Sequence, residues 1–96
     1  MRACVLKITG RVQGVGFRWF AQQTADTLGV LGHVRNVPDG SVEVLAQAEP
    51  APLEAFCARM SVGPPAATVE SVSSTKVEVD PELGDFRVRY GADRES

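Results

Sequence analysis

The sequence predicts an α+β fold in which two helices cover one face of an antiparallel sheet. Two observations lead to this prediction. Two segments have apolar residues that recur at helical spacing. Each is preceded and followed by segments in which apolar and polar residues alternate, a pattern typical of half-buried strands. Glycine and proline separate these segments. The elements therefore follow in the order β-α-β-β-α-β, with an extra short strand at the end.

The chain begins with a predicted strand and helix. Residues 3–9 alternate as in a strand, and Gly10 ends it. From residue 17 the apolar residues follow the i, i+3, i+4, i+7 spacing of one helix face. Gly29 can adopt the left-handed conformation that commonly ends a helix, so we expect this helix to cover about residues 17–28.

A hairpin and a second helix follow. Strands over about residues 31–37 and 42–48 are joined by Pro38-Asp39-Gly40-Ser41, in which proline presets φ and glycine accepts positive φ. The second helix begins near Pro50 and ends before Gly63. Its predicted buried face consists of Leu53, Phe56, Cys57 and Met60.

Two more strands complete the predicted fold. A long strand is expected over roughly residues 69–79, with Val69 and Val72 on opposite faces because successive side chains alternate. A last short strand is expected over residues 86–90. This order is a split βαβ arrangement, which predicts a ferredoxin-like sandwich.

The chain is long enough for one domain. Its 96 residues are 44% hydrophobic, which suffices for one ordinary core. We expect the domain to span residues 1–90 and residues 91–96 to form a polar tail.

Charge and hydropathy favour a cytoplasmic protein without a nucleic-acid or membrane partner. The 10 basic residues are scattered among 12 acidic ones, and the net charge is -2, so no basic face for a phosphate backbone is indicated. Lys7 comes too early for the apolar core of a signal peptide, and no apolar segment approaches the ~20 residues of a membrane span. We expect a monomer.

Metal, cofactor and triad chemistry are disfavoured. Cys4 and Cys57 lack CxxC spacing, and His33 is the single histidine, so neither a zinc site nor a Ser/His/Asp triad is indicated. Each cysteine is expected to be a small buried apolar residue. We therefore expect no metal and no cofactor.

The loop before the first helix carries the candidate chemistry. Three glycines occur within residues 10–16, where backbone N–H groups can converge on an anion at the helix N-terminus. Arg18 offers a permanently charged fork for phosphoryl oxygens. Trp19 stands where a GxGxxG motif needs glycine, and no GK[ST] ending follows, so nucleotide binding is disfavoured. From spacing alone, a tight turn with a surface arginine remains an equal alternative.

The residues of this loop resemble a known family. Residues 10–18, Gly-Arg-Val-Gln-Gly-Val-Gly-Phe-Arg, are similar to the phosphate-loop signature of the acylphosphatases, and Gly32-His33-Val34-Arg35-Asn36 is similar to their second signature. The resemblance covers about residues 3–90. It includes Pro38-Asp39-Gly40-Ser41-Val42-Glu43, Gly63-Pro64 and Phe86-x-Val88-x-Tyr90.

The resemblance implies an enzyme that hydrolyses acyl phosphates to carboxylate and inorganic phosphate. It implies that Arg18 binds the phosphoryl group and that Asn36 positions the attacking water. It also implies substrate contacts from the loop residues Gln13, Gly14, Val15, Gly16 and Phe17. His33 stands where the family usually has a bulky aromatic residue, and no tryptophan occurs near Arg59.

Strand alternation gives His33 and Asn36 different expected positions. The strands on either side of a βαβ crossover run parallel, so Asn36 should lie at the same sheet edge as the glycine loop. Asn36 shares a face with Val34, whereas His33 faces the other way and is not expected to act as a base. Trp19 is expected to be a partly exposed packing residue. Without the resemblance, Asn36 could equally be a turn residue that closes the hairpin.

Two alternatives to a free-standing hydrolase remain. A ferredoxin-like domain can be a non-enzymatic anion-binding or regulatory module. The chain also resembles the acylphosphatase-like domain of larger hydrogenase-maturation carbamoyltransferases, which is associated with carbamoyl phosphate. A free-standing hydrolase is expected because the sequence runs from Met1 to Ser96 without zinc motifs. Its few candidate residues can suffice, because a carboxylate is a good leaving group and fixed donors with one positioned water can supply most of the catalysis.

Overall fold

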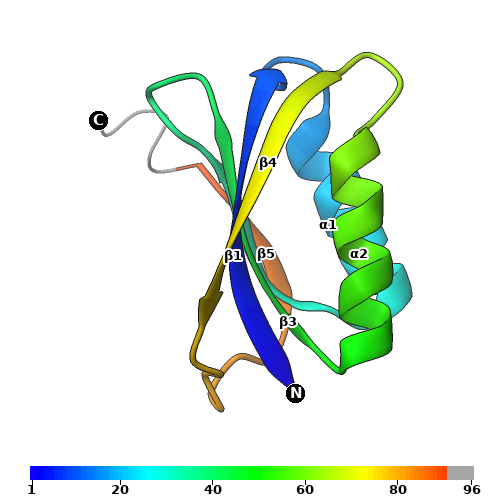
Figure 1. Ribbon diagram of the computed structural model, residues 1–96, viewed down its shortest axis with the longest axis vertical. Coiled ribbons are helices and arrows are strands. Elements are labelled where there is room, and N and C mark those ends of the chain that lie inside the picture. The colour runs from blue at the N-terminus through cyan, green and yellow to red at the C-terminus, as the bar shows by residue number, and fades with distance from the viewer. Residues whose placement is uncertain (91–96) are drawn as a thin grey trace.

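The computed structural model describes residues 1–90, so the tail predicted for residues 91–96 lies outside the described residues. Over residues 1–90 the order of elements is the predicted one (Figure 1). The elements are β1 (Arg2–Arg11), α1 (Phe17–Leu28), β2 (Leu31–Asn36), β3 (Val42–Ala48), α2 (Pro50–Val62), β4 (Thr68–Val77) and β5 (Phe86–Arg89).

The sheet of residues 1–90 is mixed, which corrects the expectation of a purely antiparallel one. Its strand order is β4-β1-β3-β2-β5. The pairs β4/β1, β1/β3 and β3/β2 are antiparallel as expected, but β5 is parallel to β2. The reason is the connection over residues 78–85. It crosses one end of the sheet from β4 to the opposite edge, so the chain enters β5 at the end where β2 also begins.

A register shift in the β1/β4 ladder changes which residues of β4 face the core. Thr9 pairs with Ser71 but Gly10 pairs with Val69, so Glu70 is an extra residue in β4. Val69 and Val72 consequently both pack against the core, although simple alternation predicted opposite faces. The shift also allows β1 to continue to Arg11, beyond its expected end.

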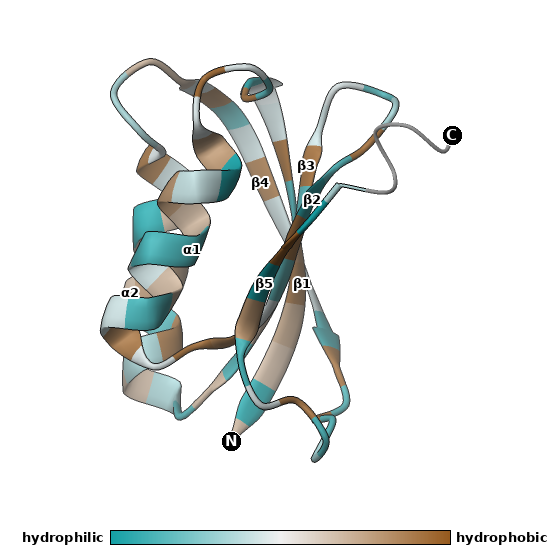
Figure 2. Cartoon of the chain, turned by 180° about the vertical axis from the view of Figure 1, so that it is seen from behind, coloured by the Kyte–Doolittle hydropathy of each residue, from teal (hydrophilic) through white to brown (hydrophobic). Residues whose placement is uncertain are grey.

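The core lies between the sheet and a single layer of two helices within residues 1–90 (Figure 1). Apolar side chains of α1 and α2 pack in the core. Hydrophilic residues recur along both helices (Figure 2). Cys4 is buried and Cys57 is half-buried, as expected for small apolar residues. The largest buried apolar side chains are Phe17, Phe56, Leu6, Ile8, Met60, Val12, Val34, Val42 and Val44.

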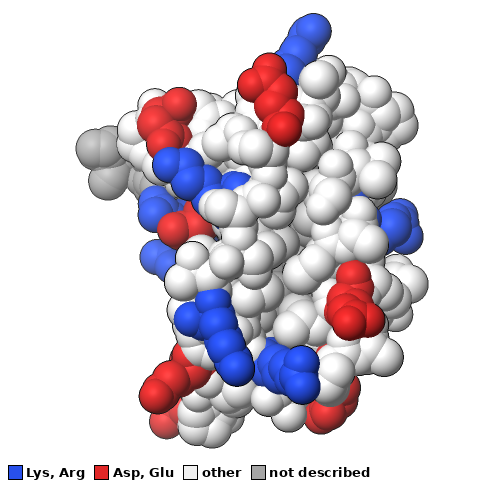
Figure 3. All heavy atoms as spheres, in the orientation of Figure 1, with Lys and Arg blue, Asp and Glu red and all other residues white. Residues whose placement is uncertain are grey.

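The surface does not concentrate one sign of charge on the face that Figure 3 shows. Acidic and basic side chains are interspersed there (Figure 3). No helix within residues 1–90 is long and apolar enough to cross a membrane.

Candidate active site

The predicted site residues come together at one edge of the sheet. Because β1 and β2 are both antiparallel to β3, they run in the same direction, and β5 is parallel to β2. The carboxyl ends of β1, β2 and β5 therefore lie at one edge. The N-terminus of α1 follows the loop after β1 and lies at the same edge.

A pocket of about 180 Å³ lies at this edge. Arg18 and Asn36 both line it, although they are 18 positions apart in the sequence. The strand topology brings them together. Of the predicted substrate-binding loop, Gly14, Gly16 and Phe17 line the pocket, whereas Gln13 and Val15 are not among its lining residues. The other residues that line it are Val12, Trp19 and Tyr90.

Two glycines give the loop its shape. Gly14 and Gly16 have φ values of 73° and 81°, and Gly16 is the residue that precedes the first turn of α1. A Cβ atom at either position would meet nothing within 4 Å, so glycine is needed there for its backbone conformation and not for space. The N–H group of Phe20 bonds to the carbonyl of Gly16. The first turn of a helix generally presents N–H groups and a positive dipole end that suit an anion.

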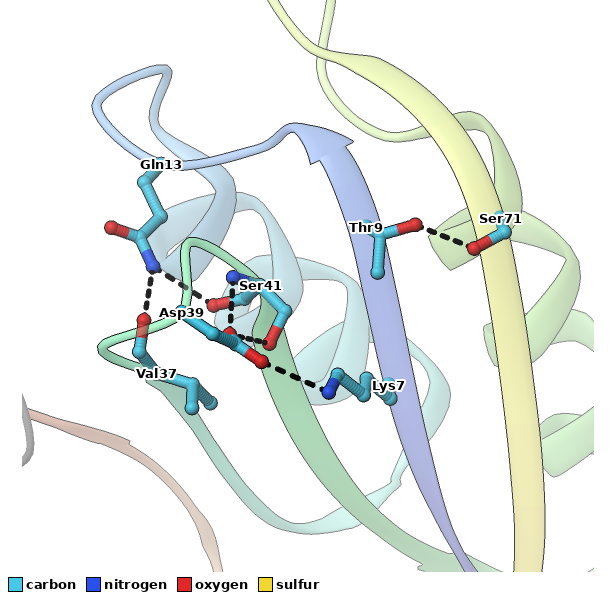
Figure 4. A network of polar contacts seen from close by, with 7 residues as sticks. All are labelled: Lys7, Thr9, Gln13, Val37, Asp39, Ser41 and Ser71. Atoms are coloured by element: carbon cyan, nitrogen blue, oxygen red, sulfur yellow. Dashed lines mark hydrogen bonds and ion pairs between the residues drawn. The ribbon is translucent and has the colours of Figure 1, made fainter.

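The side chain of Gln13 ties this loop to the β2–β3 hairpin (Figure 4). Its Nε2 donates to the carbonyl oxygens of Val37 (2.8 Å) and Ser41 (2.9 Å). These two residues also bond to each other through the N–H of Val37 and the carbonyl of Ser41 (2.9 Å). The loop after β1 and the turn after Asn36 thus form one hydrogen-bonded unit.

Asp39 organises the hairpin turn in this unit. Its Oδ1 accepts hydrogen bonds from the backbone N–H (2.9 Å) and the hydroxyl (2.6 Å) of Ser41, and its Oδ2 pairs with Lys7 Nζ at 2.9 Å (Figure 4). The bonds from Ser41, followed by Lys7, hold the pKa of Asp39 well below its ordinary value. Asp39 is therefore an anion at neutral pH and holds the turn in place.

Tyr90 is a site residue that sequence reasoning missed. The guanidinium carbon of Arg18 lies 4.6 Å from the centroid of the Tyr90 ring, within cation–π range. Alternation was a usable signal, since Phe86 and Val88 face the core and Tyr90 continues that face. The signal went unused because β5 was not expected to run parallel to β2, which is what brings its end to the loop.

His33 lies at a different position from the candidate site. It lines a separate hollow over β5 with Arg87 and Arg89, on the sheet face opposite Val34, as alternation predicted. Burial, followed by the charge of Arg89, lowers the pKa of His33 below 6.5. Its Nδ1 is buried and has no hydrogen-bond partner among residues 1–90.

Cys57 does not take part in the site either. It lines another hollow with Cys4 between β1 and α2. Burial, followed by the nearby Cys4, raises the pKa of Cys57 to about 12. Its thiol is therefore protonated at neutral pH and is a poor nucleophile.

Comparison with known proteins identifies the family. The family model described as acylphosphatase matches residues 4–88. The chain belongs to the acylphosphatase family. An acylphosphatase from Lactobacillus gasseri is 49% identical over 91 residues, which cover 94% of this chain and 100% of the relative. The crystal structure of the acylphosphatase from Bacillus subtilis matches with a TM-score of 0.90 and 36% identity, over 94% of this chain and 100% of that one.

The acylphosphatase fold also occurs within longer proteins. The crystal structure of full-length HypF in its phosphate- and nucleotide-bound form matches with a TM-score of 0.78 and 33% identity. The match covers 92% of this chain but only 12% of that chain. The ferredoxin-like fold and the family membership expected from the sequence are thereby confirmed.

Proposed function

We propose that this acylphosphatase hydrolyses acyl phosphates with Arg18 as the phosphate-binding residue and Asn36 as the residue that positions water. The observation that carries the proposal is the pocket of about 180 Å³, which Arg18 and Asn36 line together with two loop glycines. A guanidinium, helix N-terminal N–H groups and an amide are the groups needed to hold a dianion and one neutral nucleophile.

The reaction requires only positioning and charge stabilisation. The oxygen of a water molecule attacks phosphorus opposite the acyl oxygen, and the bond between phosphorus and that oxygen breaks. The carboxylate leaves with the bonding electron pair, and the water proton passes to the phosphate product or to solvent. Because a carboxylate is a weak base, whose conjugate acid has a pKa of ~4, no general acid is needed. Arg18 and the loop N–H groups neutralise the charge on the equatorial phosphoryl oxygens.

Asn36 suits the role of holding the attacking water. Its side-chain amide has both donor and acceptor atoms and does not change charge with pH, so it can orient water without removing its proton beforehand. As the last residue of β2, Asn36 is held by the β2/β3 ladder and by the hairpin turn bonded to Gln13. The proposal thus assigns distinct roles to the two residues.

The test compares variants in two assays, phosphate release from acetyl phosphate and competitive inhibition by inorganic phosphate. Losing one preorganised donor typically costs about 10² to 10³ in rate, so we expect Arg18→Ala to lose at least that much kcat/KM and to bind phosphate far more weakly. For Asn36→Ala we expect a lower kcat with little change in phosphate inhibition. Arg87→Ala, an exposed arginine on the outer face, is the matched control. Unchanged kcat in Asn36→Ala would refute the water role.

The same assay addresses the two alternatives. An anion-binding module would bind phosphate in an Arg18-dependent way but release none from acetyl phosphate. The resemblance to the acylphosphatase-like domain of hydrogenase-maturation carbamoyltransferases makes carbamoyl phosphate a second substrate worth assaying. A preference for carbamoyl over acetyl phosphate would favour that alternative. The monomeric state, the cytoplasmic location and the limits of the domain at residues 1–90 stay predictions.

A further inference from the structure

The site has room for the phosphoryl group but not for a bulky acyl group. Pockets that enclose a complete organic ligand usually measure about 300 to 1,000 Å³, whereas this pocket measures about 180 Å³. If the phosphoryl group lies beside Arg18, as the proposed function requires, the acyl group must extend to the mouth of the pocket. The side chains at the mouth then determine which acyl groups bind well.

Two exposed aromatic side chains line this pocket. Trp19 is 66% exposed and Tyr90 is 60% exposed, and they are the large exposed aromatic residues among residues 1–90. The four phenylalanines, by contrast, are buried or pack against the core. Exposed rings cost free energy in water unless something covers them, and both lie where the acyl group would emerge.

Of the two rings, Trp19 is the one placed to contact the acyl group. One face of Tyr90 already lies against the guanidinium of Arg18. Trp19 is two positions after Phe17 in α1, about 200° around the helix, so its indole projects away from the core that Phe17 enters. Its exposure of two-thirds contradicts a packing role.

The other residues of the pocket offer little to a polar acyl group. Its described lining includes no carboxylate and no hydroxyl apart from that of Tyr90. Arg18 and Asn36 are committed to the phosphoryl group and the water under the proposed function. An acyl group at the mouth therefore meets mainly aromatic surface.

We propose that Trp19 is a specificity residue that contacts the acyl group, and that the preferred substrates are acyl phosphates with a planar aromatic or large apolar acyl group. Indole and aryl rings attract each other in offset or edge-to-face geometry, and the contact also removes apolar surface from water. This inference rests on the proposed function, since it assumes that the phosphoryl group occupies the pocket.

The kinetic test compares benzoyl phosphate with acetyl phosphate in wild type, Trp19→Ala and Trp19→Phe. We expect the ratio of kcat/KM for the two substrates to fall about tenfold in Trp19→Ala and to recover largely in Trp19→Phe, because phenylalanine keeps an aromatic face. The change should appear mainly in KM for benzoyl phosphate, since the contact exists before and during the reaction. Val62→Ala removes an exposed apolar side chain at the end of α2 and should leave the ratio unchanged.

A binding test separates this inference from the proposed function. Trp19 is the only tryptophan of the chain, so its fluorescence reports directly on contact with a ligand. Benzylphosphonate, which cannot be hydrolysed as an acyl phosphate, should change the emission much more than methylphosphonate at equal occupancy. That result would support the acyl contact even if the protein hydrolysed neither substrate, an outcome that would overturn only the proposed function. Equal emission changes for both phosphonates, or an unchanged kinetic ratio in Trp19→Ala, would overturn the role of Trp19.

Discussion

The contact between Arg18 and Tyr90 suggests how one ring can orient the guanidinium of Arg18 in the pocket. A guanidinium on a long flexible side chain loses conformational freedom when it binds phosphate, and this lowers affinity. The ring of Tyr90, 4.6 Å away, restricts Arg18 before the substrate arrives. Under the proposed function, Tyr90 therefore acts through Arg18 as a positioning residue.

Removal of the Tyr90 ring should weaken phosphate binding moderately. An exposed cation–π contact contributes about 0.5–1 kcal/mol, so we expect the inhibition constant of phosphate to rise about two- to fivefold in Tyr90→Ala. Tyr90→Phe keeps the ring face and should resemble wild type. Phosphate inhibition of acetyl phosphate hydrolysis measures both variants. Equal damage in the two variants would contradict the ring's role and implicate the hydroxyl.

His33 predicts a pH dependence of stability that is separate from catalysis. Burial, then Arg89, lowers its pKa in the folded state below 6.5, while Glu43 opposes and Arg35 adds to the effect. As the pH falls through 6.5 the unfolded chain takes up the proton first, so the contribution of His33 is fully present above that pH and is lost below it. When the pH is lowered from about 7.5 to about 5.5, the free energy of unfolding should therefore fall less in His33→Gln than in wild type. Urea unfolding at the two pH values measures this, and equal losses would contradict it.

At the scale of elements, the loop after β1 and the β2–β3 hairpin act as one unit. Each of the two hydrogen bonds from Gln13 should contribute about 0.5–1.5 kcal/mol, so we expect Gln13→Ala to lower the free energy of unfolding by about 1–3 kcal/mol. Its kcat/KM should fall by about tenfold or more, because the loop and Asn36 lose their common anchor. Chemical denaturation and acetyl phosphate kinetics measure the two effects.

Gln23→Ala is the matched control for this variant. Gln23 is an exposed glutamine on α1, so its truncation should change neither quantity. A Gln13→Ala protein with wild-type kinetics would show that the tether contributes to the fold alone.

Local sequence patterns predicted the bounds of the helices and strands better than they predicted which strands pair and in which direction. The period of the apolar residues gave the bounds of α1 and the two strands of the hairpin to within one residue. It also placed Asn36 on the face of Val34. The direction of β5 was not predictable this way, because the partner of an edge strand depends on long-range packing that periodicity does not encode.

Other errors have the same physical origin. The extra residue Glu70 in β4 depends on the register with β1, so alternation wrongly assigned Val69 and Val72 to opposite faces. The bonds of Gln13 join residues that are 24 and 28 positions apart. Tyr90 was missed because only the parallel β2/β5 pair brings it to Arg18. Arg18 and Asn36 could thus be named from the sequence through the family resemblance, but Tyr90 and the hydrogen bonds of Gln13 required the structure.

At the scale of the whole molecule, the site joins elements from both ends of the chain. The loop after β1, the end of β2 and the segment after β5 all contribute to the pocket. These segments are adjacent only in the folded chain, and the unfolded chain has no equivalent pocket. A ligand of the pocket therefore binds the folded state and stabilises the whole molecule.

Inorganic phosphate, as product, should raise the thermal stability of the protein. A ligand at 100 times its dissociation constant stabilises the folded state by about 2.7 kcal/mol, and about 1 kcal/mol shifts the Tm of a domain of this size by roughly 4–8 °C. We therefore expect a rise in Tm of roughly 10–20 °C at such a phosphate concentration, and almost none in Arg18→Ala. Differential scanning calorimetry with potassium chloride at matched ionic strength separates binding from screening. An equal rise in Arg18→Ala and in wild type would show that phosphate stabilises the fold without entering the pocket, and it would remove Arg18 from the binding role.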